Sequence, residues 1–251
     1  MNATEARVSI EAFASGNRNF EVAETMMGSL PGASGSVRFM CNGNRQFVAK
    51  GARNGKGLVA EYVVARLGQL MEAPVGDIAL VSIPDALRGH PPVANMGAGV
   101  AHATRYIENL TDRAVIAYTN LPENKSRFAR LCVLYSFAGA ADHQLFYTTT
   151  APSLVYSLDH GHFFPGGPGW SSASLKGAPA AEVDGWFGGA NLAHVDLVEA
   201  RSRLESVTDT DIKNVLAGPP PDWPFTLEER DTLDTYLKTR RDTLLSILPQ
   251  A

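Results

Sequence analysis

The stretch from Ala141 to Phe164 constrains the fold of this chain more than any other. Its centre, Leu154–Leu158, is apolar and favours a strand, and it follows a threonine-rich turn that contains Pro152. This pattern predicts a β-hairpin with Asp142 at one end and Asp159 at the other. Such a chain must place two carboxylates where a buried sheet gives way to loops.

Composition limits the kinds of partner. With 45% hydrophobic and 19% charged residues, the 251-residue chain has the composition of an ordinary soluble globular protein. A formal net charge of −4 gives no electrostatic basis for binding nucleic acid or an anionic membrane. No apolar run approaches the roughly 20 residues of a membrane span, and the first residues do not resemble a secretory signal. Cys41 and Cys132 match neither a metal site nor a disulfide framework. We therefore expect a cytoplasmic protein with no nucleic-acid or membrane partner.

The N-terminal third predicts strands around one helix. Residues 5–50 are expected to form short strands, two of which, Val37–Met40 and Gln46–Lys50, flank an Asn-Gly dipeptide typical of a tight hairpin. Lys56–Met71 carries apolar residues at helical spacing and predicts a helix. Gly76–Ile83 predicts a further strand.

The remainder is predicted to be mainly helical. Asp85–Gly99 is rich in proline and glycine and is the expected linker or lobe boundary. Helices are predicted over Asn124–Ala140, Val195–Leu204, Thr208–Leu216 and Thr226–Leu248, the last opening with a Thr-x-x-Glu capping box. The expected fold class is α+β, with a β-rich N-terminal lobe over residues 1–105 and a helical C-terminal lobe over residues 106–251.

The two aspartates suit phosphoryl transfer when they are combined with a lysine and a glutamate nearer the N-terminus. Such enzymes use one carboxylate to orient an attacking hydroxyl and a second to hold Mg²⁺ against nucleotide phosphates. Lys50 ends a predicted strand, and Glu61 lies on the following helix. Protein kinases use such a pair to direct an ammonium group at the α- and β-phosphates. The same pattern also fits a lysine and a glutamate that are exposed to solvent.

A loop of small residues precedes the first strand of the Asn-Gly hairpin. Its Gly32, Ser34, Gly35 and Ser36 would let backbone N–H groups approach phosphate oxygens closely. The loop is not a P-loop, because no Gly-Lys-Ser/Thr follows and because it leads into a strand.

In this order the features resemble the HipA-like kinases, an atypical group related to phosphatidylinositol kinases, and more narrowly their compact single-domain bacterial branch. The resemblance rests on three passages, which run from PGASGSVRF to GDIALVSI, from GAADHQLFY to LVYSLDHGHFF, and over GPPPDWPFTLEERDTLDTYLKTRRDTL. It implies one two-lobed, atypical kinase domain over residues 1–251. The implied activity is that of an ATP- and Mg²⁺-dependent serine/threonine protein kinase.

The resemblance also implies a role for each candidate residue. Lys50 would contact the α- and β-phosphates, with Glu61 orienting it. Asp142 would direct the proton of the acceptor hydroxyl, and Asp159 would bind the metal. The Gly/Ser loop, residues 32–36, would bind the nucleotide, with Ser34 or Ser36 as a site of autophosphorylation.

Further implications concern the hinge and the partners. His102–Tyr106 would lie near a hinge that binds adenine. The kinase would modify a protein substrate, as a growth-inhibiting toxin or a regulatory kinase, under the control of a separate antitoxin or regulatory partner.

The chain departs from the family pattern in the catalytic loop. The family places a histidine two positions and an asparagine five positions after the catalytic aspartate, and the asparagine binds a second Mg²⁺. Here Gln144 and Tyr147 stand at these positions. A phenol is a poor ligand for Mg²⁺, whereas the carbonyl oxygen of Gln144 is a candidate metal ligand.

Two other functions fit the same residues. A kinase-fold protein that has lost phosphoryl transfer would act as a nucleotide-sensing or protein-binding module, and Tyr147 favours this alternative. A metal-dependent hydrolase would use Asp159, His160 and His162 as ligands.

Overall fold

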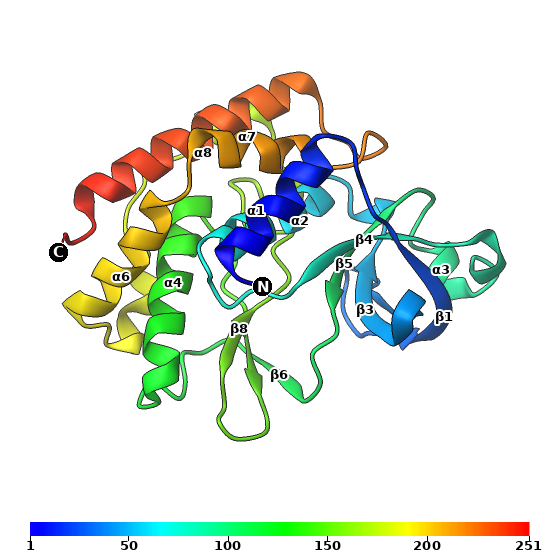
Figure 1. Ribbon diagram of the computed structural model, residues 1–251, viewed down its shortest axis with the longest axis horizontal. Helices are drawn as coiled ribbons and strands as arrows, with labels where there is room; N and C mark the ends of the chain where they lie inside the picture. The colour runs from blue at the N-terminus through cyan, green and yellow to red at the C-terminus, as the bar shows by residue number, and fades with distance from the viewer. Residues whose placement is uncertain (251) are drawn as a thin grey trace.

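Five strands of the N-terminal part close into a barrel, at the right of Figure 1. The structure is a computed structural model and describes residues 1–250. The barrel strands are β1 (Glu21–Ser29), β2 (Val37–Cys41), β3 (Arg45–Lys50), β4 (Ile78–Ser82) and β5 (Ala101–Arg105), in the order β1-β2-β3-β5-β4. Alternate residues of β2, Val37, Phe39 and Cys41, point inward and help to fill the barrel. The predicted Asn-Gly hairpin is confirmed as the short turn Asn42–Asn44, in which Gly43 has a φ of 71°.

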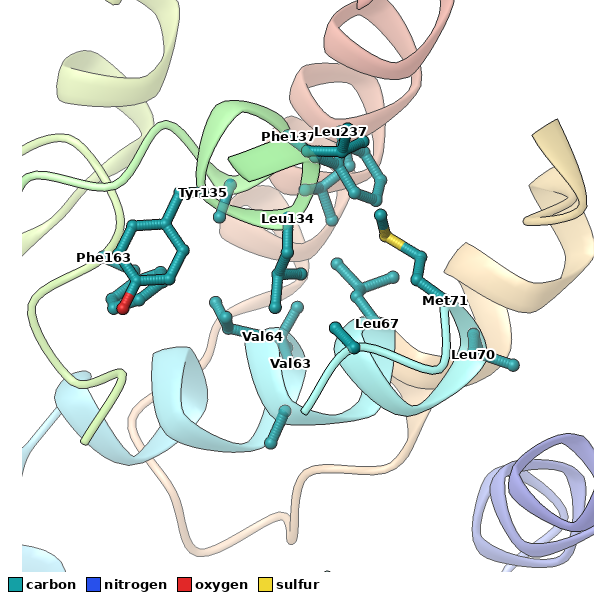
Figure 2. Packing of buried hydrophobic residues seen from close by; sticks show 14 of the residues in the cluster. Val63, Val64, Leu67, Leu70, Met71, Leu134, Tyr135, Phe137, Phe163 and Leu237 are labelled. Atoms are coloured by element: carbon teal, nitrogen blue, oxygen red, sulfur yellow. The ribbon is translucent and has the colours of Figure 1, made fainter. Parts of the chain in front are cut away.

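Helix α2 (Gly57–Leu70) is buried along its whole length and lies between the barrel and the helices of the other lobe. It contacts β4 and β5, and it also contacts α4 (Pro122–Ala138). Figure 2 shows side chains from both helices meeting in one cluster, with Val63, Val64 and Leu67 from α2 and Leu134 and Phe137 from α4. A polar side chain carried on such a helix is held in place by the core around it.

The helical lobe occupies the left of Figure 1. Besides α4 it contains α5 (Ser172–Lys176), α6 (His194–Glu205), α7 (Asp209–Ala217) and α8 (Leu227–Ile247). The four long helices predicted for this part are confirmed to within two residues at each end. The side chain of Thr226 accepts the backbone N–H of Glu229, as the predicted capping box requires. Within residues 1–250, every helix is too short or too polar to cross a bilayer.

A small second sheet lies in the C-terminal lobe. The predicted hairpin is confirmed as the antiparallel strands β7 (Leu145–Thr148) and β8 (Val155–Ser157), and Asp142 and Asp159 flank it. A third strand, β6 (Leu110–Arg113), pairs with β7 and was not predicted. It is only four residues long and ends in two exposed charged side chains, so it carries little strand signal.

The segment between α7 and α8 returns to the barrel. Asp222 Oδ2 accepts the backbone N–H of Val100 at 3.0 Å, and the indole N–H of Trp223 donates to the carbonyl of Val100 at 2.8 Å. Because Val100 immediately precedes β5, this segment joins the two lobes in addition to the 106–109 connection between β5 and β6.

Two predictions for the N-terminal part were wrong. The chain begins with α1 (Ala3–Ala14), which Asn2 caps, whereas strands were expected from residue 5. Its Ala6, Ile10 and Phe13 recur at helical spacing and are buried as α1 packs on α2 and α7. Asp85–Gly99 is not a boundary between lobes. It contains the short helices η3 (Asp85–Leu87) and α3 (Pro91–Ala94) and joins β4 to β5, which are antiparallel neighbours in the barrel.

Candidate active site

Lys50, Glu61 and Asp159 meet in one cluster, although they come from three separate segments. The Lys50 ammonium at the end of β3 donates both to Oε1 of Glu61 on α2 and to Oδ1 of Asp159 after β8. The side chains of Lys50 and Glu61 are only 11% and 4% exposed, so water does little to weaken their interaction. The alternative of a lysine and a glutamate in solvent is therefore wrong.

Electrostatics keep the pair charged. Burial alone would lower the pKa of Lys50, but the Glu61 and Asp159 carboxylates outweigh it and raise that pKa. Burial would likewise raise the pKa of Glu61, but Lys50 outweighs it and the pKa is lowered. Burial and the neighbouring Glu61 both raise the pKa of Asp159. The cluster thus contains two carboxylates and one ammonium, a charge balance that favours an additional cation.

The loop after β8 is fixed to helix α2. Glu61 Oε2 accepts the backbone N–H of His160 at 2.9 Å. Asp159 has a φ of 65°, in the left-handed region that residues other than glycine rarely adopt and that recurs at functional sites. Its side chain is 37% exposed and bonds Lys50 through Oδ1, which leaves the carboxylate open to solvent on its other side.

The histidines of this loop point to different surroundings. His160 is buried, its Nε2 lies 3.1 Å from the Ser157 hydroxyl, and burial lowers its pKa to about 4. His162 is exposed. Across the part of the chain that is described, no three His, Cys, Asp or Glu side chains are grouped as metal ligands. The three ligands that a metal-dependent hydrolase would need are not brought together.

The Gly/Ser loop closes against the connection that follows Lys50. The Ser34 and Ser36 hydroxyls lie 2.8 Å apart, and Asn54 donates to the carbonyl of Ser34 at 3.1 Å. Gly32 and Gly35 have positive φ values of 127° and 61°. A Cβ at Gly35 would lie 2.9 Å from the Arg53 guanidinium, so a larger residue there would displace that side chain. The loop and Arg53 therefore lie at the end of β3 that carries Lys50.

Asp142 is exposed in the loop between α4 and β7. The backbone N–H of Ala141 donates to the carbonyl of Phe163 at 3.1 Å, which joins this loop to the one that follows Asp159. Gln144 is not part of the Lys50 cluster. Its side-chain amide N–H donates to Asp112 on β6 at 2.7 Å, and its backbone carbonyl accepts the Tyr135 hydroxyl at 2.9 Å.

Tyr147 is fully buried. Its hydroxyl donates to the carbonyl of Val115 at 2.9 Å and accepts the backbone N–H of Ala117 at 3.1 Å. The position at which the family carries a metal-binding asparagine therefore supports the packing of the 115–117 segment here.

The expected hinge segment is mostly strand. His102–Arg105 belongs to β5, where His102 pairs with Lys50 of β3 and its buried ring packs edge-on against Trp223. The connection between the lobes begins at Tyr106, whose backbone N–H donates to Gln46 at 2.8 Å. Within the expected segment only Tyr106 lies outside β5, and adenine binding there stays a prediction.

Two side-chain contacts near the site were not predicted. His143 Nε2 lies 2.7 Å from Asp184 Oδ2, and Lys56, at the start of α2, pairs with Glu229 of α8. Lys56 also contacts the loop after Asp159, because its carbonyl accepts the indole N–H of Trp170 at 3.0 Å. The partners are 41 and 173 residues apart, so no local pattern could have linked them.

Comparisons with known proteins bear on the family and the fold of this chain. A family model described as HipA-like kinase matches residues 29–159, which contain Lys50, Glu61, Asp142 and Asp159. The chain is similar in structure to the Helicobacter pylori proinflammatory kinase CtkA, with a TM-score of 0.62 and 12% identity over 92% of this chain and 95% of that chain. It is also similar to a Golgi casein kinase, with a TM-score of 0.52 and 11% identity over 94% of this chain and 74% of that chain. At these identities the structural similarity shows the fold alone. No curated protein sequence matched the chain. Because the family model covers just over half of it, the chain belongs to the HipA-like kinase family.

Proposed function

We propose that this protein is an ATP- and Mg²⁺-dependent kinase that phosphorylates serine or threonine hydroxyls of another protein. The observation that carries the proposal is the buried cluster of Lys50, Glu61 and Asp159. Three separate segments converge to build it, which a merely structural salt bridge does not require.

Each residue has a task that its surroundings support. Lys50 is held by Glu61 and binds the α- and β-phosphates, where its positive charge offsets theirs. The Gly/Ser loop and Arg53 lie at the same end of β3 and cover the phosphates. Asp142 is exposed and orients the hydroxyl of a protein substrate that approaches from solvent.

The residues present fit Mg²⁺ with its nucleotide. Mg²⁺ prefers oxygen ligands and is usually held by one or two carboxylates together with substrate phosphates. Asp159 offers such a carboxylate in a cluster that has one negative charge in excess. When bound, ATP supplies the phosphoryl group, and Mg²⁺ offsets the negative charge of the phosphates. We also propose that the side-chain carbonyl oxygen of Gln144 becomes a Mg²⁺ ligand when the amide no longer donates to Asp112.

A second function is favoured by Tyr147 alone. Because this buried phenol replaces the family asparagine, a ligand for a second Mg²⁺ is missing from that position. A kinase-fold module that binds nucleotide without transferring phosphate would have the same cluster. Phosphoryl transfer separates the two functions.

The decisive experiment is calorimetric titration of ATP with and without Mg²⁺, on the wild-type protein and on Asp159→Ala. We expect Mg²⁺-dependent binding that weakens at least about tenfold in the variant, because a charge-assisted metal contact is lost. Asp85→Ala, at a fully exposed aspartate, is the matched control and should bind as wild type does.

Transfer of labelled γ-phosphate to protein then distinguishes the kinase from the nucleotide-sensing module. Binding without transfer would support the module. The absence of any binding at millimolar ATP would refute both functions.

Family membership also supports a biological role that we propose with the activity. The kinase would restrain growth by modifying a protein, and a separate antitoxin or regulatory protein would control it. Growth arrest on expression of the wild type, and its loss with Asp142→Asn, would support this role.

A further inference from the structure

The proposed catalytic Asp142 has no hydrogen-bond partner for its side chain in the described part of the chain, so its position depends on its neighbours. On one side, Ala141 donates to Phe163 at 3.1 Å. On the other side stands His143, whose side chain is only 25% exposed. Orientation of the carboxylate is therefore set largely by how these neighbours are held.

The His143 ring is held by one hydrogen bond and two aromatic contacts. Its Nε2 lies 2.7 Å from Asp184 Oδ2, and because a carboxylate only accepts, Nε2 carries the proton. The ring packs against Tyr135 and Trp186, with centroid distances of 5.5 Å and 4.8 Å. The bond to Asp184 therefore fixes both the tautomer and the rotation of the imidazole.

Asp184 is itself anchored at three points. Its backbone N–H donates to the Ser136 hydroxyl on α4 at 2.9 Å. Its Oδ1 accepts the backbone N–H of Trp186 at 2.9 Å and so caps the short helix η5 (Gly185–Ala190). Its Oδ2 is left for His143. Asp184 thus connects three segments: its backbone contacts α4, and its carboxylate contacts η5 and the catalytic loop.

We propose that Asp184 is a positioning residue that acts through His143 on Asp142, and that the pair couples the catalytic loop to η5. This inference rests on the proposed kinase function. A carboxylate that orients an imidazole is a recurrent way of fixing groups at an active site. Through these two hydrogen bonds of Asp184, η5 lies next to the loop that carries Asp142.

A purely structural role for the pair makes different predictions. If the pair only holds aromatic packing, its loss lowers stability and leaves turnover unchanged. If it positions Asp142, its loss lowers kcat while KM for ATP stays the same, because the Lys50 cluster is untouched.

Two conservative variants separate these roles. Asp184→Ser keeps a cap on η5 but is too short to reach His143, so it removes the bond. His143→Phe keeps the aromatic stack and removes the bond. Glu182→Gln, an exposed isosteric change in the same segment, is the matched control.

We expect each variant to lower the kcat for phosphoryl transfer about 10- to 100-fold. The double variant should be no slower than the slower single one, because both changes break one unit. Wild-type kcat in Asp184→Ser, or losses that multiply in the double variant, would overturn the inference.

A second measurement keeps the inference testable if the wild type transfers no phosphate and the kinase proposal fails. Hydrogen exchange in peptides that cover residues 139–147 should be faster in Asp184→Ser than in the wild type, and unchanged in Glu182→Gln. Unchanged exchange in Asp184→Ser would refute the positioning role even though the chain folds.

Discussion

Replacing Lys50 with methionine tests the physical basis of the site without assuming any activity. The variant keeps the length of the side chain but leaves Glu61 buried beside Asp159 with no ammonium between them. Removing one partner of a buried ion pair costs about 3–5 kcal/mol, because the remaining charge is uncompensated. The side chain of Asp159 is 37% exposed, so solvent screens its share, and we assign the cost to Glu61. We therefore expect a loss of about 3 kcal/mol in the free energy of unfolding at pH 7.5.

The stability deficit of the Lys50→Met variant should depend on pH. In the wild type, burial alone would raise the pKa of Glu61, but the effect of Lys50 is larger and the pKa is lowered. The stability that the ionised Glu61 contributes is therefore fully present down to its unfolded pKa of about 4.3. Without Lys50, burial dominates and raises the folded pKa of Glu61 above that value. The variant then regains stability as pH falls through the raised pKa. Its deficit should be largest at pH 7.5 and clearly smaller at pH 4.5.

Urea denaturation followed by tryptophan fluorescence at both pH values measures the deficit. Lys213→Met, at an exposed lysine, is the control and should change stability little. A deficit below about 1 kcal/mol, or one that is equal at both pH values, would refute the argument that Glu61 is a buried charge stabilised by Lys50.

Three other predictions follow from individual contacts. Asp142→Asn should lower phosphoryl transfer about 10²- to 10⁴-fold in a labelled-ATP assay, with unchanged ATP affinity and melting temperature, because Asp142 is exposed and its loss removes a proton acceptor; weaker ATP binding would contradict this. Tyr147→Asn should lower the free energy of unfolding, measured by thermal denaturation, by about 3–5 kcal/mol, since a buried aromatic ring and two hydrogen bonds are lost. Faster transfer at unchanged stability would show instead that the phenol blocks a metal site. Burial lowers the pKa of His160 to about 4, so between pH 6.5 and 4 only the unfolded chain gains the proton, and stability should fall by about 3 kcal/mol. His160→Gln should flatten this part of a pH series of urea denaturation curves, and an equally steep fall in the variant would rule out His160 as its cause.

The sequence identified the parts of the site that local patterns define. Lys50 and Glu61 each stand in an element with a clear periodicity, and Asp159 follows a short β-favouring run, so all three were found. Asp184 could not be found in the same way, because its partner His143 lies 41 residues away and its only local signal is that of a helix cap. Helix α1 was missed although Ala6, Ile10 and Phe13 have helical spacing, because the cap at Asn2 was not recognised. The surroundings of Gln144 and Tyr147 depend on β6 and on the 115–117 segment, which are placed by tertiary contacts.

The second connection between the lobes has a consequence for synthesis of the chain. Helix α2, which carries Glu61, packs on α4 and α7, and Lys56 at its start pairs with Glu229. Val100, beside β5, bonds to Asp222 and Trp223. A ribosome-bound chain that stops before these residues contains every candidate catalytic group but lacks the contacts that Lys56 and Val100 make with residues 222–229. This second connection between the lobes can therefore form only after residue 229 has left the ribosome, well after Asp159 has been synthesised.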